Sequence, residues 1–316
     1  MKDSAGDGTA ASAHRMSLSE DKINTLKRLA ARAAVAVACI LILAKAGAWV
    51  LTGSVSLLST LIDSLLDAAA STVNLLAIRH AAQPADKEHR FGHGKAEPLA
   101  GLAQAAFVSG SAAFLVFQSM ERLFHPVRIE NSNIGIAVMV FSMAMTLGLV
   151  LFQRFVVSKT NSVAISADAL HYRSDLLVNT AVIVALIVSA KFGLLIADPI
   201  LALMVAVYIL ISAKDIFLSS YNMLMDRELP DADRERIREI ALRNPRVISV
   251  HDLRTRSAGT RSFIQFHLEL NGDLTLREAH AIADSVMETI EEAFPNADVL
   301  IHEDPHGVQE RRAAFE

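Results

Sequence analysis

The sequence has little cysteine and no excess of basic residues. Cys39 is the only cysteine among 316 residues and lies in an apolar run, which excludes a disulfide framework and a thiolate zinc site. The formal net charge of −4 provides no basic surface for nucleic acid. The HExxH motif of zinc hydrolases is also absent. Any metal site in this chain must therefore use oxygen and nitrogen ligands.

Apolar residues, in contrast, are abundant. They make up 52 % of the chain, too much for an ordinary soluble domain, while the 20 % of charged residues need a region in water. About 20 apolar residues in a helix cross the roughly 30 Å hydrocarbon core of a bilayer. These lengths predict a multi-pass α-helical membrane protein with six transmembrane helices. The six apolar runs lie at about 30–51, 56–79, 97–120, 134–156, 161–190 and 197–219.

A polar region follows the last apolar run. Residues 231–244 and 275–294 have the periodicity of amphipathic helices, whereas 247–257, 261–270 and 297–304 alternate as strands do. The order αββαβ predicts a small α+β domain of the ferredoxin or metallochaperone type.

The expected domains follow from these patterns, and basic residues predict their orientation. A disordered tail is expected at 1–20, the six-helix domain at 21–219, a cytoplasmic domain at 220–306 and a C-terminal tail at 307–316. Lys and Arg gather in cytoplasmic loops, and here they concentrate before the first span and after the second. Both termini should therefore be cytoplasmic. The residues counted on that side are Lys22, Lys27, Arg28, Arg32, Arg79, Lys87, Arg90 and Lys95, against Arg122, Arg128 and Lys191 on the other.

Two apolar runs carry ionisable pairs with the same spacing. Asp63 and Asp67 are four residues apart in the second run, as are His171 and Asp175 in the fifth, so each pair shares one helix face. An acid at a helix centre costs roughly 2.5 to 3.5 kcal/mol on insertion scales, so these acids need a partner. Counting about 1.5 Å per residue from the helix ends sets Asp67 level with His171, and Asp63 level with Asp175.

Three carboxylates and one imidazole fit a tetrahedral site for Zn²⁺ or a similar divalent ion. The alternative is structural, since buried polar groups also form hydrogen bonds between membrane helices. A site with four protein ligands leaves no position for an activated water, which argues for a carrier and against an enzyme. Metal binding displaces protons from its ligands, and His171 is the natural proton carrier. Lys45, in the first run, is expected to pair within the bundle or extend to its surface.

Several segments together resemble the cation diffusion facilitator family, and most closely its bacterial zinc and ferrous-iron efflux branch. The resemblance covers about residues 30 to 306, and the acid-bearing helix followed by HRFGHGK and HYRSD is its most specific part. It is carried by the strings GSVSLLSTLIDSLLD, PADKEHRFGHGKAEPLA, SADALHYRSD, DPILAL, LPDADRERI, HDLRTR, IQFHLE and IHEDP.

The resemblance implies a homodimeric zinc/proton antiporter of the bacterial inner membrane, with Fe²⁺ or Cd²⁺ as alternative substrates. It places metal ligands at three sites and a dimer-stabilising salt bridge at Lys95 and Asp226. The transport site would use Asp63, Asp67, His171 and Asp175, the loop site Asp86, His89 and His93, and a binuclear C-terminal site His251, His267, His280, His302 and Asp304. Taken alone, the loop residues are more typical of an ordinary polar loop. Single exposed histidines are usually solvated as well, but the four histidines and one acid of the C-terminal region are too many to dismiss in this way.

The leading hypothesis is thus a secondary transporter whose partners are a second copy, the lipid bilayer, divalent ions and protons, without nucleic acid. A membrane-anchored metal sensor or scaffold is the alternative, although a sensor has no use for ligands at the midplane. An intramembrane metalloenzyme lacks a free coordination position and a recognisable nucleophile.

Overall fold

The computed structural model describes residues 20–53, 55–124, 133–192 and 196–308. The expected N-terminal tail, apart from Glu20, lies outside these ranges, as does most of the C-terminal tail. Most of the loop expected after the third span, between 125 and 132, also lies outside them.

Six long helices form the N-terminal part, as the apolar runs predict. Each has 27 to 33 residues, so each rises about 40 to 50 Å and exceeds the roughly 30 Å of a hydrocarbon core. The last of them continues to Leu224, past residue 219 where the apolar run ends. Their bounds are α1 Glu20–Thr52, α2 Val55–Ala81, α3 Ala96–Phe124, α4 Asn133–Thr160, α5 Val163–Phe192 and α6 Ala197–Leu224.

Among the residues that the structure describes, length and composition alone identify α1, α2, α3, α4 and α6 as candidate membrane spans. Helix α5 carries Asp168, Arg173 and Asp175 in its first half, and its second half, from Leu176, is predominantly apolar.

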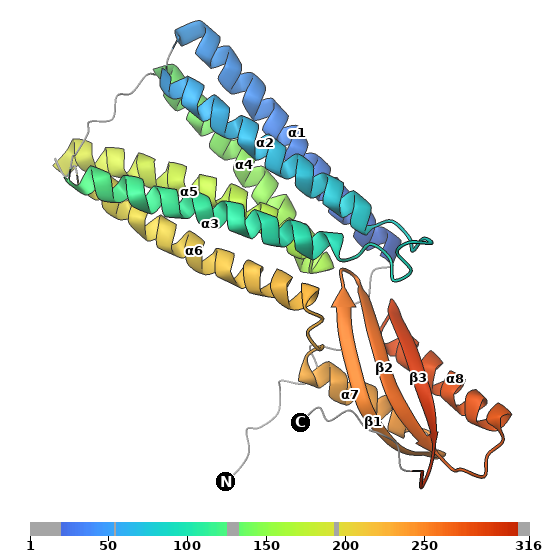
Figure 1. The fold of residues 1–316 in the computed structure, drawn as a ribbon. Coiled ribbons are helices and arrows are strands. Elements are labelled where there is room, and N and C mark those ends of the chain that lie inside the picture. Colours follow the sequence, from blue (N-terminus) through green and yellow to red (C-terminus); the bar gives the residue numbers. More distant parts are fainter. Residues whose placement is uncertain (1–19, 54, 125–132, 193–195, 309–316) are drawn as a thin grey trace, which may run out of the picture.

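The helices form two groups in space, with α1, α2 and α4 in one and α3 and α6 in the other, while α5 contacts members of both (Figure 1). Fully buried Ala30, Ala31 and Ala34 let α1 approach its neighbours closely. Helices α3, α5 and α6 share a core that includes Val108 and Ile209. Helix α5 is thus positioned to present side chains to α2.

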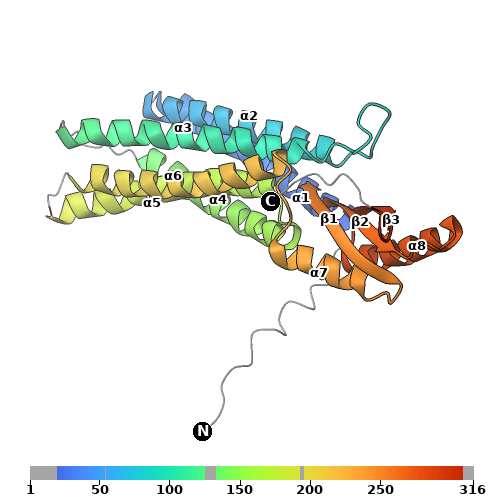
Figure 2. The same ribbon diagram turned by 60° about the horizontal axis from the view of Figure 1, so that its bottom comes forward.

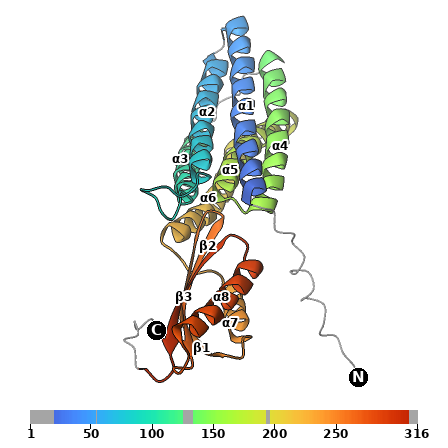
Figure 3. The same cartoon turned by 90° about the vertical axis from the view of Figure 1, so that its right-hand side faces the viewer.

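The C-terminal part folds in the predicted order αββαβ. Strands β1 and β2 are antiparallel neighbours, whereas β3 runs parallel to β2 because α8 is the crossover between them. Both helices lie on one face of the sheet, where they bury an apolar core with side chains of β2 (Figure 3). The bounds are α7 Asp231–Leu242, β1 Val247–Ala258, β2 Arg261–Leu270, α8 Leu276–Ala293 and β3 Ala297–Pro305.

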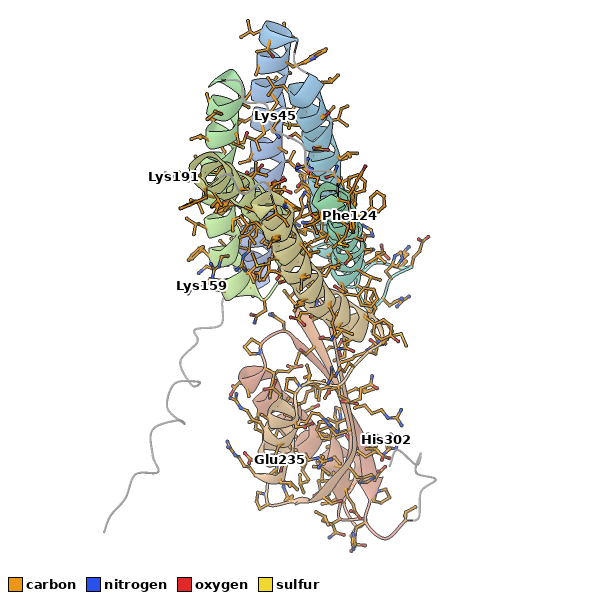
Figure 4. The ribbon with its side chains drawn as sticks, turned by 90° about the vertical axis from the view of Figure 1, so that its left-hand side faces the viewer. Lys45, Phe124, Lys159, Lys191, Glu235 and His302 are labelled. Atoms are coloured by element: carbon orange, nitrogen blue, oxygen red, sulfur yellow. The ribbon has the colours of Figure 1, made fainter. Side chains whose placement is uncertain are left out.

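The C-terminal domain lies at the end of the bundle where α1 begins and α6 ends (Figures 1 and 4). Figure 4 places Lys159 at that end and Lys45 farther from the domain. The connection between α2 and α3 also extends past the bundle at this end (Figure 2). Three segments distant in sequence therefore meet at one end of the bundle.

Candidate metal centres

Helices α2 and α5 bring together three of the four ionisable residues predicted for the bundle. Asp67, His171 and Asp175 can each offer a ligand atom within 4.8 Å of the others. The Nε2 atom of His171 lies 2.9 Å from Oδ1 of Asp67 and 3.8 Å from Oδ2 of Asp175. The ring of Phe107 on α3 packs against the His171 imidazole with centroids 5.6 Å apart. Two carboxylates and one imidazole suit Zn²⁺ or Fe²⁺.

Asp63 lies one turn away along α2 and is not a member of this group. Its side chain is exposed, and the neighbouring turn of α2 is occupied by Lys45 from α1. The Lys45 Nζ donates to Ser64 Oγ at 2.6 Å and to the Thr60 carbonyl at 3.1 Å. The expectation that Lys45 pairs within the bundle is therefore confirmed, whereas the fourth predicted ligand is not brought to the other three.

A fully buried polar layer lies one turn beyond the group, toward the C-terminal domain. Asp168 of α5 accepts hydrogen bonds from Ser71 Oγ at 3.2 Å and from Gln153 Nε2 at 2.6 Å, which ties α5 to α2 and α4. Ser71 also lies 2.8 Å from the Tyr172 hydroxyl. The sequence analysis missed this layer, although Asp168 shares the α5 face of His171 by helical spacing.

Exposure to solvent falls from Asp175 through Asp67 and His171 to Asp168. The Asp175 side chain is 41 % exposed and that of Asp67 23 %, whereas His171 is 6 % exposed and Asp168 is fully buried. Farther along, the buried Lys27 Nζ lies 2.6 Å from Glu97 Oε2 and closes the bundle near the C-terminal domain. Burial of this line of side chains therefore increases from Asp175 toward the C-terminal domain.

The connection between α2 and α3 holds a second group, formed by Asp86, His89 and His93. The Asp86 carboxylate lies 3.4 Å from His89 Nδ1 and 3.3 Å from His93 Nε2. Backbone N–H groups of His89, at 2.6 Å, and Glu88, at 2.9 Å, donate to Asp86 and hold its pKa below the usual value. The carboxylate is therefore ionised at neutral pH and suited to bind a cation. All three predicted loop residues come together.

The open face of the sheet carries a third group. His251, His267 and His302 are direct neighbours across β1, β2 and β3, and Asp304 follows on the same face of β3. The Asp304 carboxylate lies 3.1 Å from His251 Nε2, 2.8 Å from His267 Nδ1 and 3.1 Å from His302 Nε2. One buried acid therefore contacts three imidazoles on the open face of the sheet.

The position of His280 differs from the five-residue set that the resemblance implies. It lies on α8, across the sheet from the open face, where its Nε2 is 3.5 Å from Asp284 and its Nδ1 is 3.7 Å from Glu303. Figure 4 shows His302 on the side of the domain away from Glu235 of the helical layer. Within one chain, His280 therefore stays apart from the other four residues.

The bundle and the sheet meet at a tight junction next to the loop group. Lys95 Nζ lies 2.9 Å from Asp226, so the predicted pair forms within one chain. The Phe91 ring, between two loop ligands, contacts the Arg256 guanidinium at 5.0 Å from its centroid. A Cβ at Gly94 would lie 2.3 Å from the Ala258 carbonyl oxygen, so only glycine allows this approach.

Comparison with known proteins gives a family match for both the helix bundle and the C-terminal domain. Residues 31–225 match the family described as "Cation efflux transmembrane domain", and residues 229–306 match "Cation efflux protein, cytoplasmic domain". A "Cation-efflux pump FieF" of Shewanella oneidensis is 49 % identical over 89 % of this chain and 95 % of its own length. A protein of the same name from Serratia proteamaculans is 48 % identical over 92 % of this chain and 96 % of its own.

Solved structures match a smaller part. A putative zinc transporter CzrB in its zinc form is 41 % identical over 27 % of this chain and 99 % of that structure, with a TM-score of 0.26. The metal-bound C-terminal domain of the CzcD transporter from Thermotoga maritima is 28 % identical over 25 % of this chain and 93 % of its own, with a TM-score of 0.24. The two family matches and the relatives near 49 % identity show that this chain belongs to the cation diffusion facilitator family of membrane-spanning cation efflux transporters.

Proposed function

We propose that this cation efflux protein exports Zn²⁺ from the cytoplasm in exchange for protons, with Fe²⁺ and Cd²⁺ as alternative substrates. The proposal rests on one observation, the convergence of Asp67, His171 and Asp175 inside the helix bundle. Charged groups at this depth are costly unless they serve a pathway or a bound ion. Their donor atoms match those that hold zinc in proteins.

The geometry of His171 supports exchange of the metal for protons. A contact of 2.9 Å between His171 Nε2 and an Asp67 oxygen needs one proton between the two atoms. That nitrogen can bind a metal ion only with its lone pair free, so the proton must leave when Zn²⁺ arrives. When protons return from the opposite side, they restore the hydrogen bond and displace the ion. The same atom therefore couples the two fluxes.

The distribution of exposure supports alternating access. Within the substrate group, Asp175 is the most exposed residue and lies farthest from the cytoplasmic domain on α5, while Asp168 and the Lys27–Glu97 pair are buried on the side toward that domain. Release to the far side is consistent with this arrangement. Uptake from the cytoplasm then requires α5 to move relative to α2 and α4, so that the Asp168 layer opens.

The distribution of charge supports an orientation with both termini in the cytoplasm, and the similarity to bacterial cation-efflux pumps supports an inner membrane location. The start of α1, the connection between α2 and α3, and the cytoplasmic domain share one end of the bundle (Figure 1). That end carries the basic residues Lys27, Arg28, Lys87, Arg90 and Lys95, whereas Arg122 and Lys191 lie near the other. The positive-inside rule favours this orientation.

The cytoplasmic domain is proposed to bind metal as part of a homodimer. Four of its five implied ligands are gathered on the open face of one sheet, and His280 is on the opposite side. If His280 takes part in that site, it must come from a second copy. Metal bound there would hold two domains together and sense the cytoplasmic metal concentration, provided that its affinity differs between the transporter's states.

Uptake into inside-out membrane vesicles tests the proposal. Vesicles with the wild-type protein should accumulate Zn²⁺ when their interior is acidic, and a protonophore that collapses the pH gradient should remove this uptake. Uptake that is unaffected by the protonophore would contradict antiport. A protein that binds Zn²⁺ without any uptake would instead be a membrane-anchored sensor or scaffold.

Asp67→Ala links the activity to the site. It should abolish Zn²⁺ uptake, while size-exclusion chromatography shows a folded protein in the wild-type oligomeric state. Asp215→Ala, at an exposed acid on α6, is the matched control and should leave uptake unchanged. Unimpaired uptake by Asp67→Ala would place the pathway elsewhere.

A further inference from the structure

The metal group between α2 and α3 is one ligand short of a closed site. Asp86, His89 and His93 supply three donors, whereas structural zinc sites are almost always tetrahedral with four. The other two groups differ in this respect, since the sheet has four clustered ligands and the bundle group carries a substrate that must leave. A fourth donor for the loop site must therefore come from a residue close to these three.

His80 provides the nearest additional imidazole. Its ring centroid lies 4.5 Å from that of His93 at an interplanar angle of 63°, as close as His89, whose centroid is 4.6 Å away. His93 is thus flanked by one imidazole from the loop and one from the last turn of α2. In the part of the chain that the structure describes, the Nδ1 of His93 is buried and has no hydrogen-bond partner.

The His80 side chain is able to turn toward the three ligands. It is exposed, and within the described ranges its imidazole makes no hydrogen bond or ion pair. Its ligand atoms do not yet lie within 4.8 Å of all three others, so a rotation about its side-chain bonds is required. The backbone is fixed, because Gln83 N–H donates to the His80 carbonyl at the end of the helix. A movable side chain on a fixed backbone suits a ligand that closes around an ion.

Electrostatics at this position favours a cation. The C-terminal end of a helix carries partial negative charge from its unpaired carbonyls, and His80 lies in the last turn of α2. Asp86 adds a carboxylate, which the backbone N–H groups of Glu88 and His89 hold in place by hydrogen bonds. One carboxylate and three neutral imidazoles would leave a bound divalent ion with only a single net positive charge.

We propose that His80 is the fourth ligand of this site, which then holds one divalent metal ion through Asp86, His80, His89 and His93. The inference rests on the proposed function to the extent that the loop binds a metal at all. A four-ligand site would fasten the end of α2 to the loop that carries Phe91 and Gly94, which contact the cytoplasmic domain. Such a site retains its ion and is distinct from the substrate group in the bundle.

Cobalt spectroscopy on the full-length protein tests this assignment. Tetrahedral Co²⁺ absorbs visible light much more strongly than Co²⁺ with five or six ligands, so the spectrum reports coordination and not activity. Titration with Co²⁺ should show that His80→Ala loses the loop contribution to the tetrahedral band. The variant should also bind Co²⁺ at the loop about 10- to 100-fold more weakly, at least the loss caused by removing supporting groups around a metal site.

Three further variants keep the test decisive. His80→Phe retains an aromatic ring against His93 without a nitrogen and should behave as His80→Ala, whereas His306→Ala, at an exposed histidine bonded to Glu269, should match the wild type. A full tetrahedral band in His80→Ala or in His80→Phe would overturn the proposal, and would leave His80 only a role in packing against His93. If His93→Ala also keeps the full band, the loop binds no metal, and that part of the proposed function fails as well.

Discussion

The group in the bundle and the cluster on the sheet use the same donor chemistry on very different supports. Asp67 and His171 project from two helices, whose backbone hydrogen bonds are all internal, so nothing in the backbone joins one ligand to the other. His251, His267 and His302 project from neighbouring strands that share a hydrogen-bonded ladder in direct register. A small movement of one helix can therefore separate the ligands in the bundle. The histidines on the sheet cannot separate without breaking backbone hydrogen bonds between strands.

This difference matches what each site has to do. A substrate site must bind its ion from one side of the membrane and release it to the other, which requires ligands that separate. A site that holds two domains together or senses metal benefits from ligands that stay in place, and a single acid, Asp304, serves all three imidazoles there. Equivalent substitutions in the two sites should therefore have unequal effects on transport.

His171→Ala should have the largest effect. It removes both the metal-binding nitrogen and the proton held against Asp67, so Zn²⁺ uptake into inside-out vesicles should fall by about 100-fold or more. Isothermal titration should still detect metal binding at the sheet cluster. Uptake within a factor of two of the wild type would mean that the bundle group does not carry the substrate.

His267→Ala makes the same chemical change on the rigid support. It removes the central imidazole of the sheet cluster, which should weaken metal binding there by about 10- to 100-fold and slow uptake only several-fold. Metal binding in the bundle should persist, as shown by titration of the detergent-solubilised protein. If this variant abolished binding at every site, the two regions would not have separate roles.

Much of this architecture is encoded in local patterns. The lengths of the apolar runs predict the six helices, and strand alternation predicts that His267 faces away from the core. The four-residue spacing of His171 and Asp175 correctly indicates a shared helix face opposite Asp67. These features depend only on neighbouring residues in the chain.

Features that depend on how helices rotate and pack could not be predicted. Counting residues gives the height of Asp63 in the bundle, but not the rotation and tilt that leave it outside the group. Helix α8 packs against one face of the sheet, and the histidines of β2 and β3 lie on the other, so His280 is separated from them. The spacing of the five ligands along the chain does not reveal this. The role of Asp168 depends on its hydrogen bonds with Ser71 and Gln153, which lie on other helices and are distant in sequence.

Gly94→Ala tests the junction that connects the two regions and should have an intermediate effect. Its new Cβ would lie 2.3 Å from the Ala258 carbonyl oxygen, so the loop and the β1–β2 hairpin must separate, at a cost of about 1 to 3 kcal/mol. Hydrogen exchange should become faster at the hairpin, and uptake should decrease. Gly110→Ala is the control, because nothing lies within 4 Å of its Cβ position. Unchanged exchange in Gly94→Ala would show that the two regions are not joined at this contact.

Thr275→Ala should have the smallest effect and tests whether the sheet platform depends on the helices behind it. Thr275 accepts from the Glu278 N–H and donates to the Glu278 carboxylate at 2.7 Å, forming a capping box at the start of α8. Losing an N-cap costs about 1 kcal/mol, so exchange in the first turn of α8 should be roughly fivefold faster at neutral pH. Metal binding on the open face should not change.

The pH dependence of the difference in hydrogen exchange between Thr275→Ala and the wild type identifies the cause of that difference. The hydrogen bonds from Thr275 lower the pKa of Glu278 below its ordinary value of 4.5. A carboxyl whose pKa is lower in the folded state stabilises that state above the ordinary value, and this contribution is lost as pH falls through the folded pKa. The gap in exchange between Thr275→Ala and the wild type should therefore narrow below about pH 4.5. A gap independent of pH would mean that the hydroxyl acts through the backbone N–H alone, without the carboxylate.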